Sequence, residues 1–154
     1  MKEKIENVYG HRVRVRVCGL CFEGDDLLMV NHKGLTGGDF WAPPGGGMEF
    51  GEKAADCLVR EFREETGLDV EVGRFCFACE YLTPPLHAIE LFFEVSVRGG
   101  SVVKGDDPEL PIISDVRFLS PSAIGQLPPA SLHGIFQRIN NPAALRTLTG
   151  FYTI

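Results

Sequence analysis

The stretch that decides the fold runs from Gly45 to Leu68 and reads GGGMEFGEKAADCLVREFREETGL. Its first part is rich in glycine, and from Lys53 the apolar residues follow helical spacing, which predicts a helix over 53–66. Thr66-Gly67 supplies the stop, because glycine readily adopts the left-handed conformation that ends a helix. The sequence therefore predicts a shaped glycine loop that leads directly into an amphipathic helix.

Three glutamates, Glu61, Glu64 and Glu65, lie beside the apolar stripe of this helix. On a helical wheel they fall within about 100° of one another. Like charges at these spacings each cost a few tenths of a kcal/mol in a bare helix. Two interpretations remain open: an acidic face turned to solvent, or a divalent-cation site. Mg²⁺ prefers carboxylate oxygens and shares its coordination with substrate phosphates.

The composition limits the partners. The chain has 154 residues, enough for one domain, and 21 acidic against 15 basic residues give a net charge of −6. No basic surface is indicated, so we expect no nucleic-acid polymer and no anionic membrane as a partner. A small anionic substrate stays possible if a cation mediates. No apolar run reaches the roughly 18 residues of a membrane span, and the start of the chain is charged, so we expect a cytoplasmic protein.

The cysteines raise a second metal hypothesis. Four of the five form two C-x-x-C pairs, Cys18–Cys21 and Cys76–Cys79. Zinc sites place such pairs on turns, whereas these lie in apolar, strand-like runs where residues i and i+3 point to opposite faces. We therefore expect buried core cysteines, with a structural zinc site as the alternative.

Period-two patterns elsewhere predict a mixed sheet covered by helices on both sides. The segment 40–47 is predicted to be too rigid and kinked for a regular element, and Ser120 and Ser131 are predicted to begin two short helices. The predicted strands lie at 12–22, 27–30, 70–81, 87–97 and 112–119.

Alternation is clearest at the start of the first strand, where arginines 12, 14 and 16 interleave with valines 13, 15 and 17. The pattern predicts an arginine face in solvent and a valine face on the core. Contact of Arg12, Arg14 or Arg16 with substrate phosphates is the alternative.

From Gly46 to Leu68 the chain resembles the Nudix box, G-x5-E-x7-R-E-U-x-E-E-x-G-U, in which U is a bulky apolar residue. The preceding segment 41–45 is similar to the family's usual lead-in. The resemblance implies an α/β fold, an α/β/α sandwich with a mixed β-sheet, in a single domain over 1–154 with a core at about 10–140 and a C-terminal tail at 141–154. All nine fixed places are filled, by Gly46, Glu52, Arg60, Glu61, Phe62, Glu64, Glu65, Gly67 and Leu68.

The resemblance also implies Mg²⁺- or Mn²⁺-dependent hydrolysis of a pyrophosphate bond in a nucleoside diphosphate linked to another moiety. By matching positions, Glu61, Glu64 and Glu65 would be metal ligands, together with the Gly45 carbonyl. Arg60 would hold the glutamates, and Glu52 would support the loop and helix. Glu61 is the candidate general base, and the alternatives are the loop acids Asp106, Asp107 and Glu109.

Substrate recognition is weakly indicated. The substrate-binding candidates are Arg14, Trp41 and Glu109. Phe40, Trp41 or Phe77 could stack a base. A proline after the box, here Pro84 or Pro85, is similar to the pattern of members that act on ADP-ribose, whereas Tyr81 falls short of the tyrosine spacing of diadenosine-polyphosphate members.

Two further points stay open. The apolar residues 151–154 are expected to dock on the core or on a partner subunit, which makes a homodimer possible. A non-catalytic Nudix-fold nucleotide sensor is the alternative function.

Overall fold

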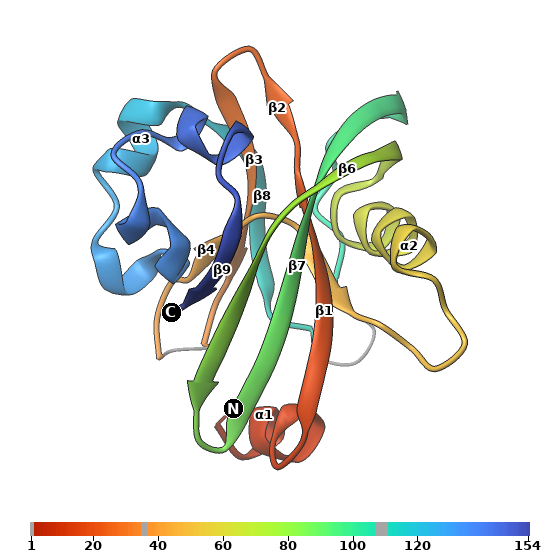
Figure 1. Ribbon diagram of the computed structural model, residues 1–154, viewed down its shortest axis with the longest axis vertical. Helices are drawn as coiled ribbons and strands as arrows, with labels where there is room; N and C mark the ends of the chain where they lie inside the picture. Colours follow the sequence, from red (N-terminus) through yellow and green to blue (C-terminus); the bar gives the residue numbers. More distant parts are fainter. Residues whose placement is uncertain (1, 35–36, 107–110) are drawn as a thin grey trace.

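The computed structural model describes residues 2–34, 37–106 and 111–154 (Figure 1). The predicted helix over 53–66 is confirmed, and the predicted strands are present with longer or shifted ends. The helices are α1 (Lys2–Tyr9), α2 (Ala54–Thr66) and α3 (Pro121–Gly125), with 3₁₀ turns at Pro129–Ser131, Gly134–Arg138 and Pro142–Arg146. The strands are β1 (Val13–Leu20), β2 (Phe22–Glu23), β3 (Asp26–His32), β4 (Trp41–Ala42), β5 (Gly45–Gly47), β6 (Leu68–Thr83), β7 (Leu86–Gly100), β8 (Ile113–Leu119) and β9 (Gly150–Thr153).

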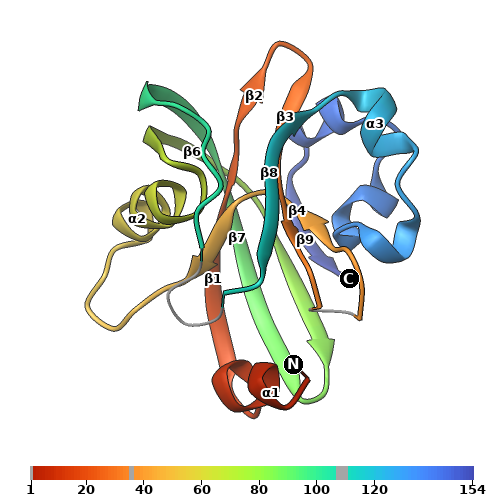
Figure 2. The same cartoon turned by 180° about the vertical axis from the view of Figure 1, so that it is seen from behind.

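The strands form two sheets, one in the order β5-β1-β7-β6-β9 and one in the order β2-β3-β4 with β8 paired to β3. The first sheet is mixed, because β1 runs parallel to β7 and β6 parallel to β9, whereas β6 and β7 are antiparallel. Figures 1 and 2 show α2 on one side of the strands and α3 with the 3₁₀ turns on the other. The predicted α/β class with a mixed sheet is confirmed.

Two apolar clusters hold the layers together. In one, Phe77 and Phe92 stack with ring centroids 4.5 Å apart. In the other, Phe62 packs α2 onto β1, where a Cβ at Gly19 would lie 2.4 Å from the Phe62 ring. Gly19 is thus required for helix–sheet contact, and α2 is held in a fixed position over the sheet.

The segment 40–47 contradicts its prediction, since it contains the short strands β4 and β5. β5 pairs with β1, and a Cβ at Gly45 would lie only 2.2 Å from the Val17 carbonyl oxygen. The absence of side chains allows the β5 backbone to lie between β1 and α2. The glycines therefore serve close backbone packing rather than a turn.

The C-terminal part differs from its prediction at Ser131, which ends a 3₁₀ turn instead of beginning a helix. Leu132 is instead extended and forms a parallel β-bridge with Trp41, and the His133 amide donates to the Trp41 carbonyl, so pairing with β4 replaces the first turn of the predicted helix. The apolar tail forms β9, which pairs with β6 inside the fold. Helix α1 was not predicted; it is eight residues long and packs Ile5 and Tyr9 against Ile112.

All five cysteines are buried free thiols, as predicted for core residues. Cys18 and Cys21 belong to different apolar clusters, as expected for opposite faces of a strand. Cys76 and Cys79 lie in one cluster, next to a register shift of β6 between Phe75 and Phe77. In the part of the chain that the structure describes, no helix is long and apolar enough to cross a membrane.

Candidate active site

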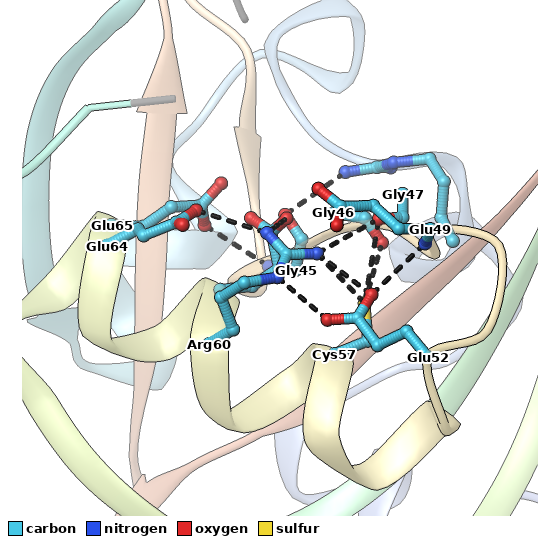
Figure 3. Close-up of polar contacts among 11 residues, drawn as sticks. Gly45, Gly46, Gly47, Glu49, Glu52, Cys57, Arg60, Glu64 and Glu65 are labelled. Carbon is cyan, nitrogen blue, oxygen red and sulfur yellow. Dashed lines mark hydrogen bonds and ion pairs between the residues drawn. The ribbon is translucent and has the colours of Figure 1, made fainter. Parts of the chain in front are cut away.

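Arg60 is the centre of the polar network on α2 (Figure 3). Its guanidinium binds Glu52 as a fork, with Nε–Oε1 and Nη2–Oε2 distances of 2.8 and 3.1 Å. Nη1 donates to Glu61 Oε1 at 2.9 Å and to Glu64 Oε2 at 3.3 Å. One cationic nitrogen therefore already lies between two of the predicted metal ligands.

Glu52 joins this network to the loop. Its Oε2 also accepts a hydrogen bond from the Glu49 amide at 3.0 Å. The hydrogen bond from Arg60 is the main cause that holds the pKa of Glu52 below its usual value. Since Arg60 also donates to the Gly47 carbonyl, Glu52 and Arg60 connect the loop, the glycine strand and α2.

Glu61 and Glu65 lie against the glycine strand. A Cβ at Gly46 would lie 2.2 Å from the carboxyl carbon of Glu61, so only glycine leaves space for that carboxylate. The Gly45 amide donates to Glu65 Oε2 at 3.2 Å, and Glu65 is 1% exposed. The bare backbone of β5 thus sets the positions of both glutamates.

The carboxylates fit a divalent cation by their chemistry. Their oxygens are the hard ligands that Mg²⁺ and Mn²⁺ prefer, and Arg60 Nη1 marks a place where positive charge is stabilised between Glu61 and Glu64. Among residues 2–34, 37–106 and 111–154, no group of three or more His, Cys, Asp or Glu side chains is gathered as a ready-made metal site. Arg60 binds one carboxylate oxygen each of Glu61 and Glu64, and the Gly45 amide binds one of Glu65.

A cavity of about 290 Å³ opens beside this carboxylate group. Gly45, Gly46 and Glu65 form its wall toward α2. Aromatic side chains from three separate segments, Tyr9, Phe40 and Tyr81, line other walls. The cavity therefore offers apolar ring surfaces next to carboxylates, a combination suited to an organic group that carries phosphates.

The arginines of β1 reverse the predicted orientation. Val13 and Val15 are 59% and 42% exposed, whereas Arg14 and Arg16 are half-buried and line the cavity. The cause is tertiary: the cavity side of this part of β1 offers Arg14 a ring, with its Cζ 4.0 Å from the centre of Tyr9. The prediction of a solvated arginine face is wrong for Arg14 and Arg16.

The remaining predicted residues are distributed unevenly. Trp41 and Phe77 are buried in the core and do not line the cavity. Asp106 lies beside α2, because its amide donates to the Glu64 carbonyl at 3.3 Å. Asp107 and Glu109 lie outside the described residues. Pro84 and Pro85 form the turn between β6 and β7.

Sequence reasoning missed a buried network on the part of the cavity wall that β1, β7 and His133 form. Glu90 Oε2 binds Arg16 Nη1 at 2.5 Å, and Glu90 Oε1 binds His133 Nε2 at 2.7 Å. Burial alone would raise the pKa of Glu90, but His133 and Arg16 outweigh it and lower the pKa to about 2. The one available signal was a glutamate inside a strongly apolar strand, on the same alternating face as Phe92 and Glu94.

A model of the NUDIX domain matches residues 10–136. The chain belongs to the Nudix family. The Nudix box of this chain, Gly46–Leu68, is the segment that forms β5 and α2 and carries the carboxylates. The predicted family and enzyme class, Nudix hydrolase, agree with this match and with the names of the relatives. Nudix hydrolases generally use divalent metal ions and act on small nucleotide substrates.

Relatives of this Nudix chain include an ADP-ribose pyrophosphatase and NAD-capped RNA hydrolases. It is 33% identical to the ADP-ribose pyrophosphatase of Methanocaldococcus jannaschii over 95 residues, 60% of this chain and 56% of the relative. It is 30% identical to the NAD-capped RNA hydrolase NudC of Pseudomonas fluorescens over 121 residues, 76% of this chain and 40% of the relative. The chain thus spans about half the length of the curated relatives it matches.

Solved structures support the same fold. The crystal structure of UDP-X diphosphatase superposes with a TM-score of 0.67 at 18% identity, covering 97% of this chain and 72% of that one. At this identity the similarity shows the fold alone.

Proposed function

We propose that the protein hydrolyses a pyrophosphate bond in a nucleoside diphosphate linked to another moiety, using Mg²⁺ or Mn²⁺. The observation that carries the proposal is the place of Arg60 Nη1 between Glu61 and Glu64, with Glu65 next to it at the edge of the cavity. An acidic face turned to solvent would not bury two of its three glutamates, yet Glu61 and Glu65 are 5% and 1% exposed.

In this proposal Glu61, Glu64 and Glu65 hold the cation, and the Gly45 carbonyl lies beside them. The bound ion would supply neutralisation of phosphate charge and a water of lowered pKa. Glu61 accepts the proton of the attacking water, and Asp106 is the described alternative, since it lies beside the Glu64 carbonyl. Arg60 and Glu52 keep the carboxylates in register with the glycine strand.

The cavity then receives the rest of the substrate. Its aromatic walls suit a base or sugar, and Glu65 lines one wall, where a pyrophosphate would enter the metal site. ADP-ribose is the first candidate substrate, because a relative of 33% identity is named for it. A dinucleotide such as NAD is the second, because NudC relatives are named for an NAD cap.

A substrate panel tests the proposal. The purified chain is incubated with Mg²⁺ or Mn²⁺ and with ADP-ribose, NAD, nucleotide sugars, dinucleoside polyphosphates or nucleoside triphosphates, and products are separated by chromatography. We expect nucleoside monophosphate release from at least one linked nucleoside diphosphate, abolished by a chelator and by Glu64→Gln. Binding of a panel member without any product would instead favour the nucleotide sensor.

A further inference from the structure

Arg16 lies on the wall of the cavity, directly beside the carboxylate group of α2. Its Nη2 donates to the Gly45 carbonyl at 3.5 Å, and the Gly45 amide donates to Glu65. Arg16 thus contacts the same glycine whose amide binds Glu65, a proposed metal ligand. A phosphate group bound at the carboxylate site would lie within reach of this guanidinium.

Glu90 and His133 hold Arg16 in this position. Glu90 accepts from Arg16 through one oxygen and from His133 through the other, and both anchoring side chains are 4% exposed. His133 Nδ1 accepts from the Ile135 amide at 3.2 Å, so the proton that faces Glu90 is on Nε2. The orientation of Arg16 is therefore set by a chain of hydrogen bonds that ends in backbone.

The guanidinium of Arg16 keeps donors available for a ligand. It carries five N–H donors, and its hydrogen bonds to other described residues use one toward Glu90 and one, at long distance, toward Gly45. The side chain is 23% exposed, and the exposed part adjoins the cavity. If Arg16 served only as the buried ion-pair partner of Glu90, its guanidinium would not need access to the cavity.

We propose that Arg16 binds a phosphate oxygen of the substrate from the cavity side, next to the proposed cation, and that Glu90 and His133 are its positioning residues. The ligand is the diphosphate of a nucleoside diphosphate derivative, so the proposal rests on the proposed function. A planar guanidinium offers two parallel donors to a phosphate, which a lysine ammonium does not. The diphosphate is thereby held between one protein cation and the metal-binding carboxylates.

Binding of ADP without metal tests the proposal. Titration calorimetry in a chelating buffer measures the dissociation constant for the wild-type protein and for Arg16→Met and Arg16→Lys. We expect ADP to bind roughly 10- to 100-fold more weakly to Arg16→Met, the loss of a charge-assisted hydrogen bond, with partial recovery in Arg16→Lys. No binding to the wild type, or equal binding to wild type and Arg16→Met, overturns the proposal.

Arg12→Met is the matched control. Arg12 lies on the same alternating arginine face, but it is exposed, bonds the Val8 carbonyl and does not line the cavity. We expect its ADP affinity to equal that of the wild type. An equal loss in Arg12→Met would mean that general charge, and not the position of Arg16, determines binding, and would overturn the assignment.

Two variants of His133 distinguish a role in positioning Arg16 from a purely structural role. We expect His133→Gln, which keeps an amide donor toward Glu90, to bind ADP nearly as the wild type does, and His133→Leu to weaken binding severalfold. In turnover assays the same loss should appear in KM more than in kcat. Thermal unfolding identifies any variant that does not fold. If His133→Leu is such a variant, Arg16→Lys and His133→Gln carry the test, and unchanged binding in Arg16→Lys overturns the fork geometry.

The two proposals fail separately. If no member of the substrate panel yields a product but ADP binding depends on Arg16, only the proposed hydrolysis is contradicted. If the protein hydrolyses a panel member but ADP binds equally to the wild type and to Arg16→Met, only the inference about Arg16 is contradicted.

Discussion

The two walls of the cavity are built in different ways. The wall toward α2 is formed by Gly45, Gly46 and Glu65, and the Arg60 network lies behind it. Among the described residues, the partners of Arg60 lie within 13 positions of it in the chain. The second wall meets the first where Arg16 contacts Gly45. It joins β1, β7 and the C-terminal turns, and its hydrogen bonds span 74 residues between Arg16 and Glu90 and 43 between Glu90 and His133. The first wall is the local wall, because its residues lie close together in the sequence. The second is the distant wall, because its residues are far apart in the sequence and meet only in the folded chain.

The difference has a physical origin. In a helix, residues three and four apart lie on one face, so the spacing of the glutamates in the sequence already places them on the same face. Partners in a sheet are set by register, and β1 and β7 pair in parallel through residues far apart in the chain. The residues of the local wall can therefore be recognised as a sequence motif, whereas those of the distant wall can be identified only in the tertiary structure.

The largest effect is expected from Gly46→Ala, a substitution in the local wall. The new methyl group would meet the Glu61 carboxylate at 2.2 Å, so the glutamate must move. We expect loss of turnover by at least about 100-fold and a destabilisation of about 1–3 kcal/mol, measured by chromatography and urea unfolding.

Gly38→Ala is the control for this substitution, because a Cβ there meets nothing within 4 Å. Wild-type turnover in Gly46→Ala would mean that the glycine strand does not position Glu61.

Glu64→Gln tests the same wall without disturbing its packing. Glu64 is 28% exposed and bonds Arg60 at the longer distance of 3.3 Å, so we expect stability to change by less than about 1 kcal/mol. Turnover should fall by about 100-fold or more through loss of a proposed cation ligand. Asp56→Asn, an exposed acid on the same helix, should retain turnover. Equal activity of the two variants would contradict the metal assignment.

Glu90→Gln tests the distant wall through its stability. We expect a loss of about 1–3 kcal/mol at neutral pH, because the substituted amide keeps the shape of the side chain but loses the charge that pairs with Arg16. The pKa of Glu90 is lowered from 4.5 to about 2, so its contribution is full above about 4.5 and is lost as the pH falls toward 2.

Urea unfolding at several pH values should therefore show the difference between wild type and Glu90→Gln shrinking over that interval. Glu71→Gln, which breaks an exposed pair with Arg98, should cost less than about 1 kcal/mol throughout. A difference that stays constant down to pH of about 2 would contradict the ion-pair interpretation of Glu90.

The smallest effect is expected from thiol reagents. Burial raises the pKa of Cys21 to about 11 and of Cys57 and Cys79 to about 12. Iodoacetamide at about pH 8 should leave the native chain unmodified by mass spectrometry and should modify five cysteines after unfolding. Elemental analysis of the same sample should find no stoichiometric zinc, and one zinc per chain would revive the C-x-x-C hypothesis.

Prediction from the sequence was accurate where one element carried the information. Helix α2, its end at Gly67 with φ 74° and the contacts of Arg60 with Glu52, Glu61 and Glu64 all agree with the pattern. Prediction was wrong for β5, because glycines usually mark turns, whereas these allow a strand to pair with β1 and to lie close to Glu61 of α2. It was also wrong for Arg14 and Arg16, because alternation identifies two faces of a strand but not which of them meets the core.

The sequence by itself determined the family, the mixed α/β class and the carboxylate face of α2, since these depend on residue types at short spacing. Only the tertiary structure decided that β1 turns arginines into the cavity, that Glu90 and His133 anchor Arg16, and that Gly45 connects Arg16 to Glu65. These contacts depend on register between distant strands and on which side of a sheet is covered, and no spacing within a single segment encodes either.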